Sequence, residues 1–286
     1  MTAVKILSDS TCDLPQKIIN DYNIGLIPVN VIFNDEIIPQ NKLSNKEFFD
    51  RLLQGEIATT GVPSPKTYKD AYDKALKSAD KIIVITVTGK LSGVYNAARL
   101  VAKEFYNDEV IVIDSEAVTL ENGMLVYEAA KMAKNNFTAK EITDKITSYI
   151  PSTHLLGAVD TLKFLKKGGR INMITWLLGS LLSVKPIIHV EKGQLFSPCR
   201  TRSSDHAMEI LKRASTFALQ NRIIDTVFCG YSYNMERGKE LNDFLCDLPE
   251  GPTEIIFGEI GPAMSAHIGP NAVGFAWVGD YHKDWL

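Results

Sequence analysis

Short apolar runs alternate with amphipathic segments through the first half of the chain. Runs rich in Val, Ile and Leu are typical of buried strands, whereas apolar residues spaced three and four apart are typical of helices. The pattern predicts strands over 4–7, 24–33, 82–87 and 110–113. It predicts helices over 14–22, 45–54, 65–78, 93–105 and 117–134. Such alternation indicates a mainly parallel sheet that is covered by helices.

A second set of apolar runs begins after Pro151, which follows a helix predicted over 139–149. The runs flanking residues 191–193 predict a β-hairpin. We therefore expect an α/β fold with two α/β domains, residues 1–150 and 151–286. The first would hold a mainly parallel sheet and the second a mixed sheet, with a ligand between them. The strands expected in the second domain are 155–159, 184–190, 195–198, 226–231, 254–257 and 273–278.

Composition narrows the class of protein. The chain has 286 residues, 45% of them hydrophobic, which is enough for two domains of usual size. Its 31 basic and 34 acidic residues give a net charge of −3 and no general attraction for nucleic acid. Four widely spaced cysteines without a Cys-x-x-Cys pair favour reduced thiols over a zinc site. The first residues lack the features of a signal peptide, so we expect a cytoplasmic protein.

Three turns rich in hydroxyl groups and glycine follow apolar runs, at 8–13, 59–65 and 86–93. Ligands of open α/β sheets bind beyond the carboxyl ends of the strands, where such turns lie. Thr60 and Ser92 belong to two of these turns. Two hydroxyl groups converging on one carboxylate would supply donors without burying a positive charge. The turns therefore indicate a site for a small anionic group.

Helix capping is the competing interpretation of the same hydroxyl groups. Ser64 is placed to cap the helix predicted to begin one residue later, and Ser92 to cap the next helix. For Ser10, Thr11 and Asp13, capping is the favoured interpretation because a predicted helix follows directly. For Thr60 and Ser92, both interpretations stay open.

An enzymatic function is one alternative to ligand binding, and a regulatory or scaffolding module is another. Ser92 would act as the nucleophile and His267 as its base in a hydrolase or acyltransferase. Residues 89–93 do not form the Gly-x-Ser-x-Gly turn of α/β hydrolases. The same residues lack the glycine spacing of a nucleotide-binding P-loop, so we expect Lys90 to be a solvated loop residue.

Two arginines and a histidine are further candidates for contact with an anion. Arg170 ends the run 166–170, and Arg202 follows the predicted hairpin. Basic residues in loops are usually surface charge, but two guanidiniums facing one cleft would form a receptor for carboxylate or phosphate. His267 lies in a Gly/Pro-bounded turn without a metal-binding pattern, so a structural role competes with a role as an anion partner or proton carrier.

The apolar segment 173–182, which contains Trp176, is too short to span a bilayer. It predicts either a core helix or a lid over an apolar cavity. A lid would also be the place for transient contact with a membrane surface.

Seven short segments, spread through almost the whole chain, follow the order and spacing of one known family. They are residues 8–14, 60–65, 91–98, 114–115, 165–171, 185–188 and 261–274. On these segments the chain resembles the DegV family of bacterial fatty-acid-binding proteins, which includes the binding subunits of the two-component fatty acid kinase.

The resemblance implies a two-domain α/β protein that buries a long-chain fatty acid between its domains. The carboxylate would be hydrogen-bonded by a threonine and a serine, with two arginines and a histidine completing the polar group. Carried over by motif position, and with the glycine that follows the serine, the ligand-binding residues are Thr60, Ser92, Gly93, Arg170, Arg202 and His267.

The resemblance also implies partners. In kinase-linked members a separate ATP-dependent catalytic subunit phosphorylates the bound carboxylate, and the acyl phosphate passes toward phospholipid synthesis. We therefore expect a non-enzymatic protein with no cofactor or metal, whose partners are a fatty acid and a fatty acid kinase catalytic subunit. Three departures from the family pattern bear on ligand choice and kinase pairing: Gly61-Val62 replace two polar residues, Thr119 and Glu121 replace serine and glycine, and Ala266 replaces a threonine.

Overall fold

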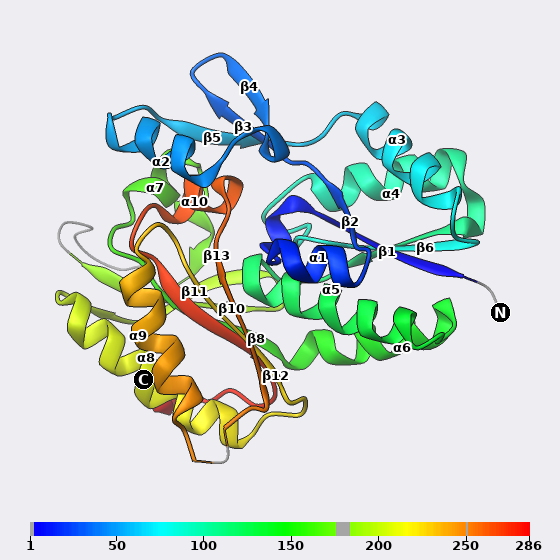
Figure 1. Ribbon diagram of the computed structural model, residues 1–286. Helices are drawn as coiled ribbons and strands as arrows, with labels where there is room; N and C mark the ends of the chain where they lie inside the picture. The colour runs from blue at the N-terminus through cyan, green and yellow to red at the C-terminus, as the bar shows by residue number, and fades with distance from the viewer. Residues whose placement is uncertain (1–2, 176–183, 250) are drawn as a thin grey trace.

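Three β-sheets form the framework of the computed structural model, which describes residues 3–175, 184–249 and 251–286 (Figure 1). In the described residues, the first sheet has four parallel strands in the order β2-β1-β6-β7. The second sheet is mixed, with the order β13-β12-β14-β8-β10-β11-β9. A small antiparallel sheet has the order β4-β3-β5. The expected α/β fold is confirmed, with a parallel first sheet and a mixed second sheet.

The first sheet is built from runs of apolar residues that are buried on both faces, as expected for a parallel sheet. Its strands are β1 (Val4–Asp9), β2 (Gly25–Ile27), β6 (Lys81–Thr86) and β7 (Val110–Asp114). Helices surround the sheet, and three of them follow one of its strands directly or after a short turn. The surrounding helices are α1 (Gln16–Asp21), α3 (Pro65–Leu76), α4 (Val94–Phe105), α5 (Thr119–Lys134) and α6 (Ala139–Tyr149).

The single strand predicted over 24–33 is wrong. The chain forms β2 and then β3 (Asn30–Phe33), which belong to different sheets. Pro28 lies between them, and proline has no N–H to continue a strand ladder. The small sheet is completed by two strands that the apolar pattern does not predict, β4 (Glu36–Pro39) and β5 (Ala58–Gly61). Helix α2 (Asn45–Leu53) connects them.

The second sheet contains the predicted hairpin. Strand β10 (Lys185–Glu191) pairs antiparallel with β11 (Gln194–Thr201). Both turn residues, Lys192 and Gly193, have positive φ angles of 48° and 70°, as a two-residue type I′ turn requires. The other strands are β8 (Thr153–Ala158), β9 (Ile174–Thr175), β12 (Thr226–Tyr231), β13 (Glu254–Glu259) and β14 (Val273–Val278).

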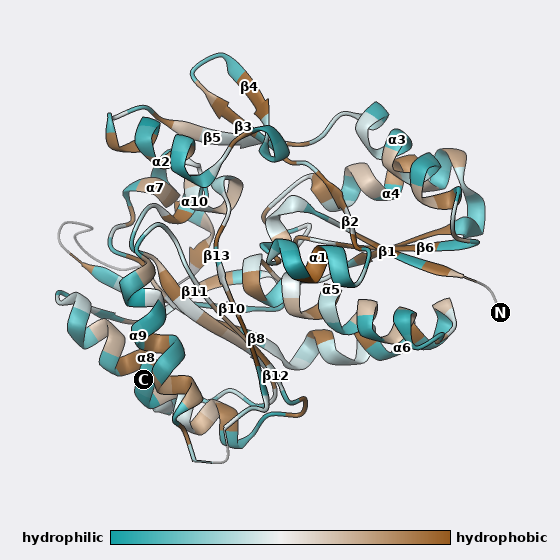
Figure 2. Cartoon of the chain, in the orientation of Figure 1, coloured by the Kyte–Doolittle hydropathy of each residue, from teal (hydrophilic) through white to brown (hydrophobic). Residues whose placement is uncertain are grey.

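Helices cover both faces of the second sheet. Helices α8 (Ser204–Gln220) and α9 (Met235–Cys246) pack on one face, and α5 from the first half packs on the other (Figure 1). Apolar strands lie inside, and the helices turn their polar residues outward (Figure 2). One hydrophobic core runs through both halves and includes Leu120 and Phe228. A second core lies beneath α8 and α9 around Trp277.

The domain boundary near Pro151 stays a prediction. Helix α6 ends at Tyr149, and a 3₁₀ turn over Ile150–Ser152 leads directly into β8. The predicted core helix or lid at 173–182 lies largely outside the described residues, as does Trp176, so the expected membrane contact also stays a prediction. Within the described ranges, we find no helix with the length and apolar character needed to cross a bilayer. The four cysteines carry free thiols.

Candidate functional site

A cavity lies between the two large sheets, where the ligand was expected. Its wall comes from both halves of the chain: the loops after β1 and β6, strand β5 and the start of α5 from the first half, and β8, β10, β14 and helix α10 (Pro262–Ile268) from the second. Among the 27 described lining residues, six have polar side chains and the others are apolar or glycine. The six are Thr11, Thr60, Ser92, Thr119, Arg170 and His267.

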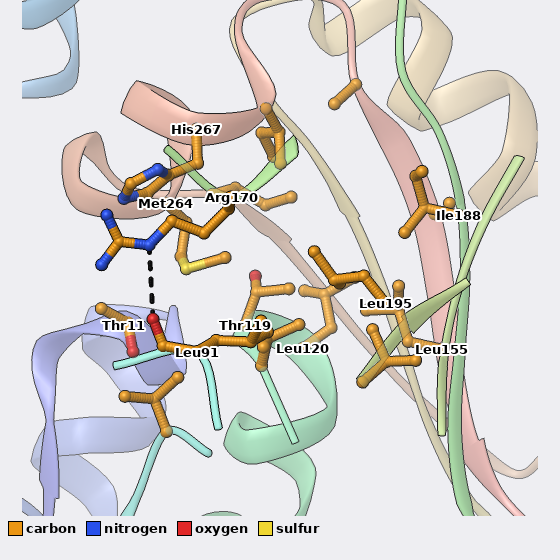
Figure 3. A pocket seen from close by; sticks show the side chains of 18 of the residues that line it. Thr11, Leu91, Thr119, Leu120, Leu155, Arg170, Ile188, Leu195, Met264 and His267 are labelled. Atoms are coloured by element: carbon orange, nitrogen blue, oxygen red, sulfur yellow. Dashed lines mark hydrogen bonds between the residues drawn. The ribbon is translucent and has the colours of Figure 1, made fainter. Parts of the chain in front are cut away.

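The polar and apolar groups of the cavity are separated in space. Figure 3 shows Arg170 and His267 near each other on one side, and Ile188, Leu195 and Leu155 on the opposite side. The cavity therefore has a polar end and an apolar end. This is the arrangement that suits an elongated amphipathic ligand.

Thr60 and His267 come together at the cavity although 207 residues separate them in the chain. Thr60 lies on strand β5, not in the predicted turn, and pairs with Val31 of β3. His267 lies in the last turn of α10. The Thr60 Oγ1 and His267 Nε2 atoms are 2.9 Å apart, which makes a hydrogen bond across the two halves.

The environment of His267 decides the direction of this hydrogen bond. Its Nδ1 atom is buried and has no hydrogen-bond partner among the described residues. A buried N–H without an acceptor is rarer than a buried lone pair without a donor, so we place the ring proton on Nε2. His267 then donates to Thr60 Oγ1, and the Thr60 hydroxyl keeps its own proton to donate into the cavity.

His267 is neutral in this setting. Burial, to which the nearby positive charge of Arg170 adds, lowers the pKa of His267 to about 4. Gly168 packs directly against the ring, since a Cβ atom at this position would lie 2.2 Å from Nδ1. The imidazole is therefore held in place as a neutral donor, not as a cation.

Arg170 supplies the positive charge of the lining. Its Nη1 donates to the carbonyl oxygen of Gly168 at 2.6 Å, and its Nε donates to the carbonyl oxygen of Leu91 at 3.3 Å (Figure 3). These bonds use two of the five guanidinium N–H groups, so others remain for an anion. Because Leu91 adjoins Ser92, the bonds also fix Arg170 relative to the Ser92 loop.

Ser92 lines the cavity, but it does not cap α4 in the predicted way. The N-cap residue is Gly93, and the Ser92 Oγ atom accepts the amide N–H of Val94 at 3.3 Å. The Ser92 hydroxyl proton is left to donate elsewhere. Gly93 is exposed and is not among the described lining residues. Ser64 caps α3 as predicted, by accepting the Thr67 amide.

The pairing that the hydrolase alternative needs is not formed. His267 bonds to Thr60, and the hydrogen bonds of the described residues include none between Ser92 and His267. Arg202, the second predicted arginine, is exposed beyond the end of β11 and is not among the described lining residues. The ligand-binding roles of Gly93 and Arg202 stay predictions.

The hydroxyls of Thr11 and Thr119 also line the cavity, and each donates to a buried carboxylate. Sequence analysis assigned Thr11 to capping and noted Thr119 only as a departure from the family pattern. Thr11 Oγ1 donates to Asp9 at 2.5 Å, and Thr119 Oγ1 donates to Asp13 at 2.6 Å. Capping by Asp13 is wrong, because α1 begins after Pro15 without a side-chain bond. The Asp13 and Thr119 side chains meet across 106 residues, so no local pattern could reveal the pair.

Two other polar residues, Lys90 and Glu121, make hydrogen bonds to the backbone. Lys90 is not simply solvated: its Nζ donates to the carbonyl oxygen of Lys192 at 2.5 Å and lies 3.3 Å from Glu116, so it joins the hairpin turn to the first half. Glu121 is buried and accepts the Val118 amide at 3.3 Å. Burial raises the pKa of Glu121 well above its usual range.

Comparison with known proteins identifies the family of the chain. The model of the DegV family, which is described as a family of uncharacterised proteins, matches residues 3–280. The chain belongs to the DegV family. A DegV domain-containing protein of Clostridium acetobutylicum is 29% identical over 278 residues, which cover 96% of this chain and 98% of that protein.

Solved DegV structures share the fold. A DegV family protein from Thermus thermophilus, described by its fatty acid binding, has a TM-score of 0.87 and 27% identity and covers 98% of this chain and 100% of its own. A Thermotoga maritima protein, described as revealing a fatty acid binding function, has a TM-score of 0.84 and 27% identity. It covers 97% of this chain and 100% of its own.

Proposed function

We propose that this DegV chain is a non-enzymatic long-chain fatty-acid-binding protein. The acyl tail is buried at the apolar end of the cavity, and the carboxylate is held at the polar end by Thr60, Ser92 and Arg170, with His267 behind Thr60. The observation that carries the proposal is the two-ended cavity, whose polar groups include two hydroxyls with protons free to donate. The fatty acid binding of the Thermus and Thermotoga relatives supports it.

The energetics favour such a ligand. Each buried methylene contributes roughly 0.8 kcal/mol, so a tail of about 16 carbons offers on the order of 12 kcal/mol before the costs of association. The tail therefore provides most of the affinity. The head group needs donors for its oxygens, and hydroxyl groups beside Arg170 supply them with less desolvation than a second buried charge would.

The donors have fixed directions. His267 donates to Thr60, so the Thr60 hydroxyl proton points away from the imidazole and toward the cavity. This chain of bonds makes His267 a positioning residue for Thr60. It also explains why the imidazole is held neutral by burial, since a neutral ring polarises the hydroxyl without adding a fixed charge.

We propose further that the bound carboxylate is presented to a separate ATP-dependent acyl kinase. One carboxylate oxygen would bond to the γ-phosphorus of ATP while the bond from that phosphorus to ADP breaks. The absence of a P-loop sequence from the chain supports a separate catalyst. Arg170, which lines the cavity, would contact the added phosphate.

Native mass spectrometry of the purified protein, followed by extraction and identification of small molecules, tests the binding function. We expect one fatty acid per chain, or uptake of added palmitate by delipidated protein. An empty protein that fails to take up fatty acids would refute the proposal. Turnover of acyl esters that disappears in Ser92→Ala would instead support the hydrolase alternative.

The kinase proposal needs a separate test. Arg170→Met and Arg202→Met are compared for palmitate affinity and for the rate of acyl phosphate formation by a fatty acid kinase catalytic subunit. We expect Arg170→Met to lower the rate more than the affinity, because the added phosphate carries more charge than the carboxylate. Equal loss of both would argue against this division of roles. Phosphorylation of free palmitate at the same rate without the chain would refute presentation.

A further inference from the structure

Asp13 connects three segments of the cavity wall. Its Oδ2 accepts the Thr119 hydroxyl at 2.6 Å, and its Oδ1 accepts the amide of Gly261 at 2.9 Å. Thr119 lines the cavity at the start of α5, and Gly261 immediately precedes α10, which carries His267. These contacts span 106 and 248 residues of sequence. One carboxylate thus sets the relative position of the loop after β1, α5 and α10.

The backbone at this junction is strained. Asp13 and Thr119 have φ angles of 47° and 42°, in the left-handed region. A β-branched residue such as threonine is rarely found there and persists only where its surroundings hold it. Gly261 is needed for the close approach, because a Cβ atom there would lie 3.0 Å from Asp13 Oδ1 and 2.5 Å from the Gln40 amide nitrogen. Strain of this kind is concentrated at functional positions.

The hydrogen bond between Asp13 and Thr119 can run in either direction. When Asp13 is ionised, the Thr119 proton is committed to the carboxylate, so Thr119 offers only lone pairs to the cavity. When Asp13 is protonated, its own O–H donates to Thr119, and Oδ1 still accepts the Gly261 amide. The Thr119 proton is then free to donate into the cavity. The wall keeps its contacts in both states, and only the hydrogen-bonding character of Thr119 changes.

Of the two neighbouring aspartates, Asp13 is better placed than Asp9 to take up a proton. It is 8% exposed, and Asp9 is a buried carboxylate nearby. Asp9 accepts three hydrogen bonds, two from Thr11 and one from the Val87 amide, whereas Asp13 accepts two. The additional donor holds negative charge better at Asp9.

The other titratable groups around Asp13 bring no positive charge to it. Cys12 precedes it and is a fully buried thiol. Glu121 on α5 bonds to the Val118 amide, and His267 at the far end of α10 bonds to Thr60. Burial raises the pKa of Asp13 to about 7 against its two hydrogen bonds, and the charge of Asp9 adds to the rise.

We infer that Asp13 is a proton-linked positioning residue: an anionic ligand enters the cavity together with one proton taken up at Asp13, which converts Thr119 from an acceptor into a donor. The inference rests on the proposed function and specifies its ligand as the anion. A ligand carboxylate adds a like charge to a poorly solvated region that already holds Asp9 and Asp13, and protonation of Asp13 removes one charge. Binding therefore raises the pKa of Asp13, so affinity for the anion falls as the pH rises above neutrality.

The experiment compares the delipidated native chain with Asp13→Asn between pH 6 and pH 9. Asparagine reproduces the protonated state, because its NH₂ group donates to Thr119 and its oxygen accepts the Gly261 amide. The ligands are palmitate and, as an uncharged control, hexadecanol. Since ionisation of free palmitate is common to both proteins, it cancels in the ratio of their dissociation constants.

We expect the native affinity for palmitate to fall by about tenfold per pH unit above pH 7, relative to Asp13→Asn. Hexadecanol should show no such dependence with either protein. A second measurement needs no variant: calorimetry of the native chain at pH 8, in buffers of different ionisation enthalpy, should show uptake of close to one proton per palmitate. The same pH dependence in native and variant proteins, or no proton uptake, would overturn the inference while leaving fatty acid binding intact. No binding of palmitate at any pH would overturn the proposed function as well.

Discussion

Buried or half-buried histidines occur in two regions of the molecule that have different neighbours. His154 and His189 lie on adjacent strands, with the Nδ1 of one and the Nε2 of the other 3.3 Å apart. Aromatic rings enclose them, and the His189 ring stacks on Tyr281 at a centroid distance of 3.8 Å. His267 instead bonds to Thr60 beside open space in the cavity.

The pKa values of the two regions are nearly alike. Burial lowers the pKa of His154 to about 4 and, together with the charge of His154, that of His189 to about 3. Burial and the charge of Arg170 lower that of His267 to about 4. A shifted pKa therefore does not separate the histidine that lines the cavity from the two that pack among aromatic rings. What separates them is whether the partner of the imidazole faces a cavity or another ring.

The largest effect should be a loss of stability, caused by a substitution in the aromatic cluster around His154 and His189. Trp277 is fully buried between His154 and Phe275, so Trp277→Ala leaves a large void. We expect the free energy of unfolding to fall by about 3–5 kcal/mol in urea titrations, with palmitate affinity of the folded protein unchanged. Trp285→Ala, at a partly exposed ring, is the control and should cost less. A loss below about 1 kcal/mol for Trp277→Ala would show that the aromatic cluster is not a packed core.

Low pH should reduce the contribution of the His154 and His189 cluster to the stability of the fold. In the unfolded chain a histidine has a pKa of about 6.5, above the folded values of about 4 and 3 for His154 and His189. The unfolded state therefore binds protons first, so this contribution to stability is complete above about pH 6.5 and is lost as the pH falls toward 4. We expect a loss of about 1.4 kcal/mol per pH unit for each imidazole.

Urea unfolding at pH 7, 6 and 5 measures this slope. His189→Gln should flatten it, and His282→Gln, at an exposed side chain, should leave it unchanged. An unchanged slope in His189→Gln would mean that other groups control the loss of stability in acid.

A substitution in the cavity should change the affinity for palmitate and leave the stability of the fold unchanged. Thr60→Val keeps the shape of the side chain and removes the donor, so we expect palmitate affinity to fall roughly 10- to 100-fold, the equivalent of a charge-assisted hydrogen bond of about 1.5–3 kcal/mol. Thr59→Val on the same strand, whose side chain faces the other way, is the matched control. Equal affinities for the two variants would remove Thr60 from the head-group site.

The smallest effect should come from Lys90, which adjoins the lining residue Leu91 in the chain. Lys90 joins the hairpin turn to the first half, but its side chain is 42% exposed, so its contacts are worth little. We expect Lys90→Met to weaken palmitate binding by about two- to fivefold. Lys66→Met, at a helical surface pair with Asp70, should have no effect. A larger loss for Lys90→Met than for Thr60→Val would place the main binding determinant at the hairpin and not at the hydroxyls.

The fold was predictable wherever a repeating apolar pattern is present. Helix α6 and strands β12 and β14 match their predicted ranges to the residue. The pattern failed for the small sheet, because β5 contains two threonines and a glycine among its four residues and carries no apolar run. It also could not show that the chain changes sheets at Pro28, since both strands are equally apolar.

The site was predictable only in part. Four of the six residues expected to bind the ligand line the cavity: Thr60, Ser92, Arg170 and His267. Their functions stay proposals. The hydrogen bonds that organise the cavity, from His267 to Thr60 and from Thr119 to Asp13, join residues more than a hundred positions apart. Such contacts depend on how sheets and helices pack, which no local pattern of residues records.

The continuous hydrophobic core has a further consequence. Leu120 and Phe228 belong to one core that spans both halves. A hinge opening of the two halves would therefore expose that core to water. A fatty acid in the cavity would extend that core with its own methylenes. Occupancy would then raise the melting temperature in proportion to the logarithm of ligand concentration, so the thermal stability of this protein would report how much lipid it carries.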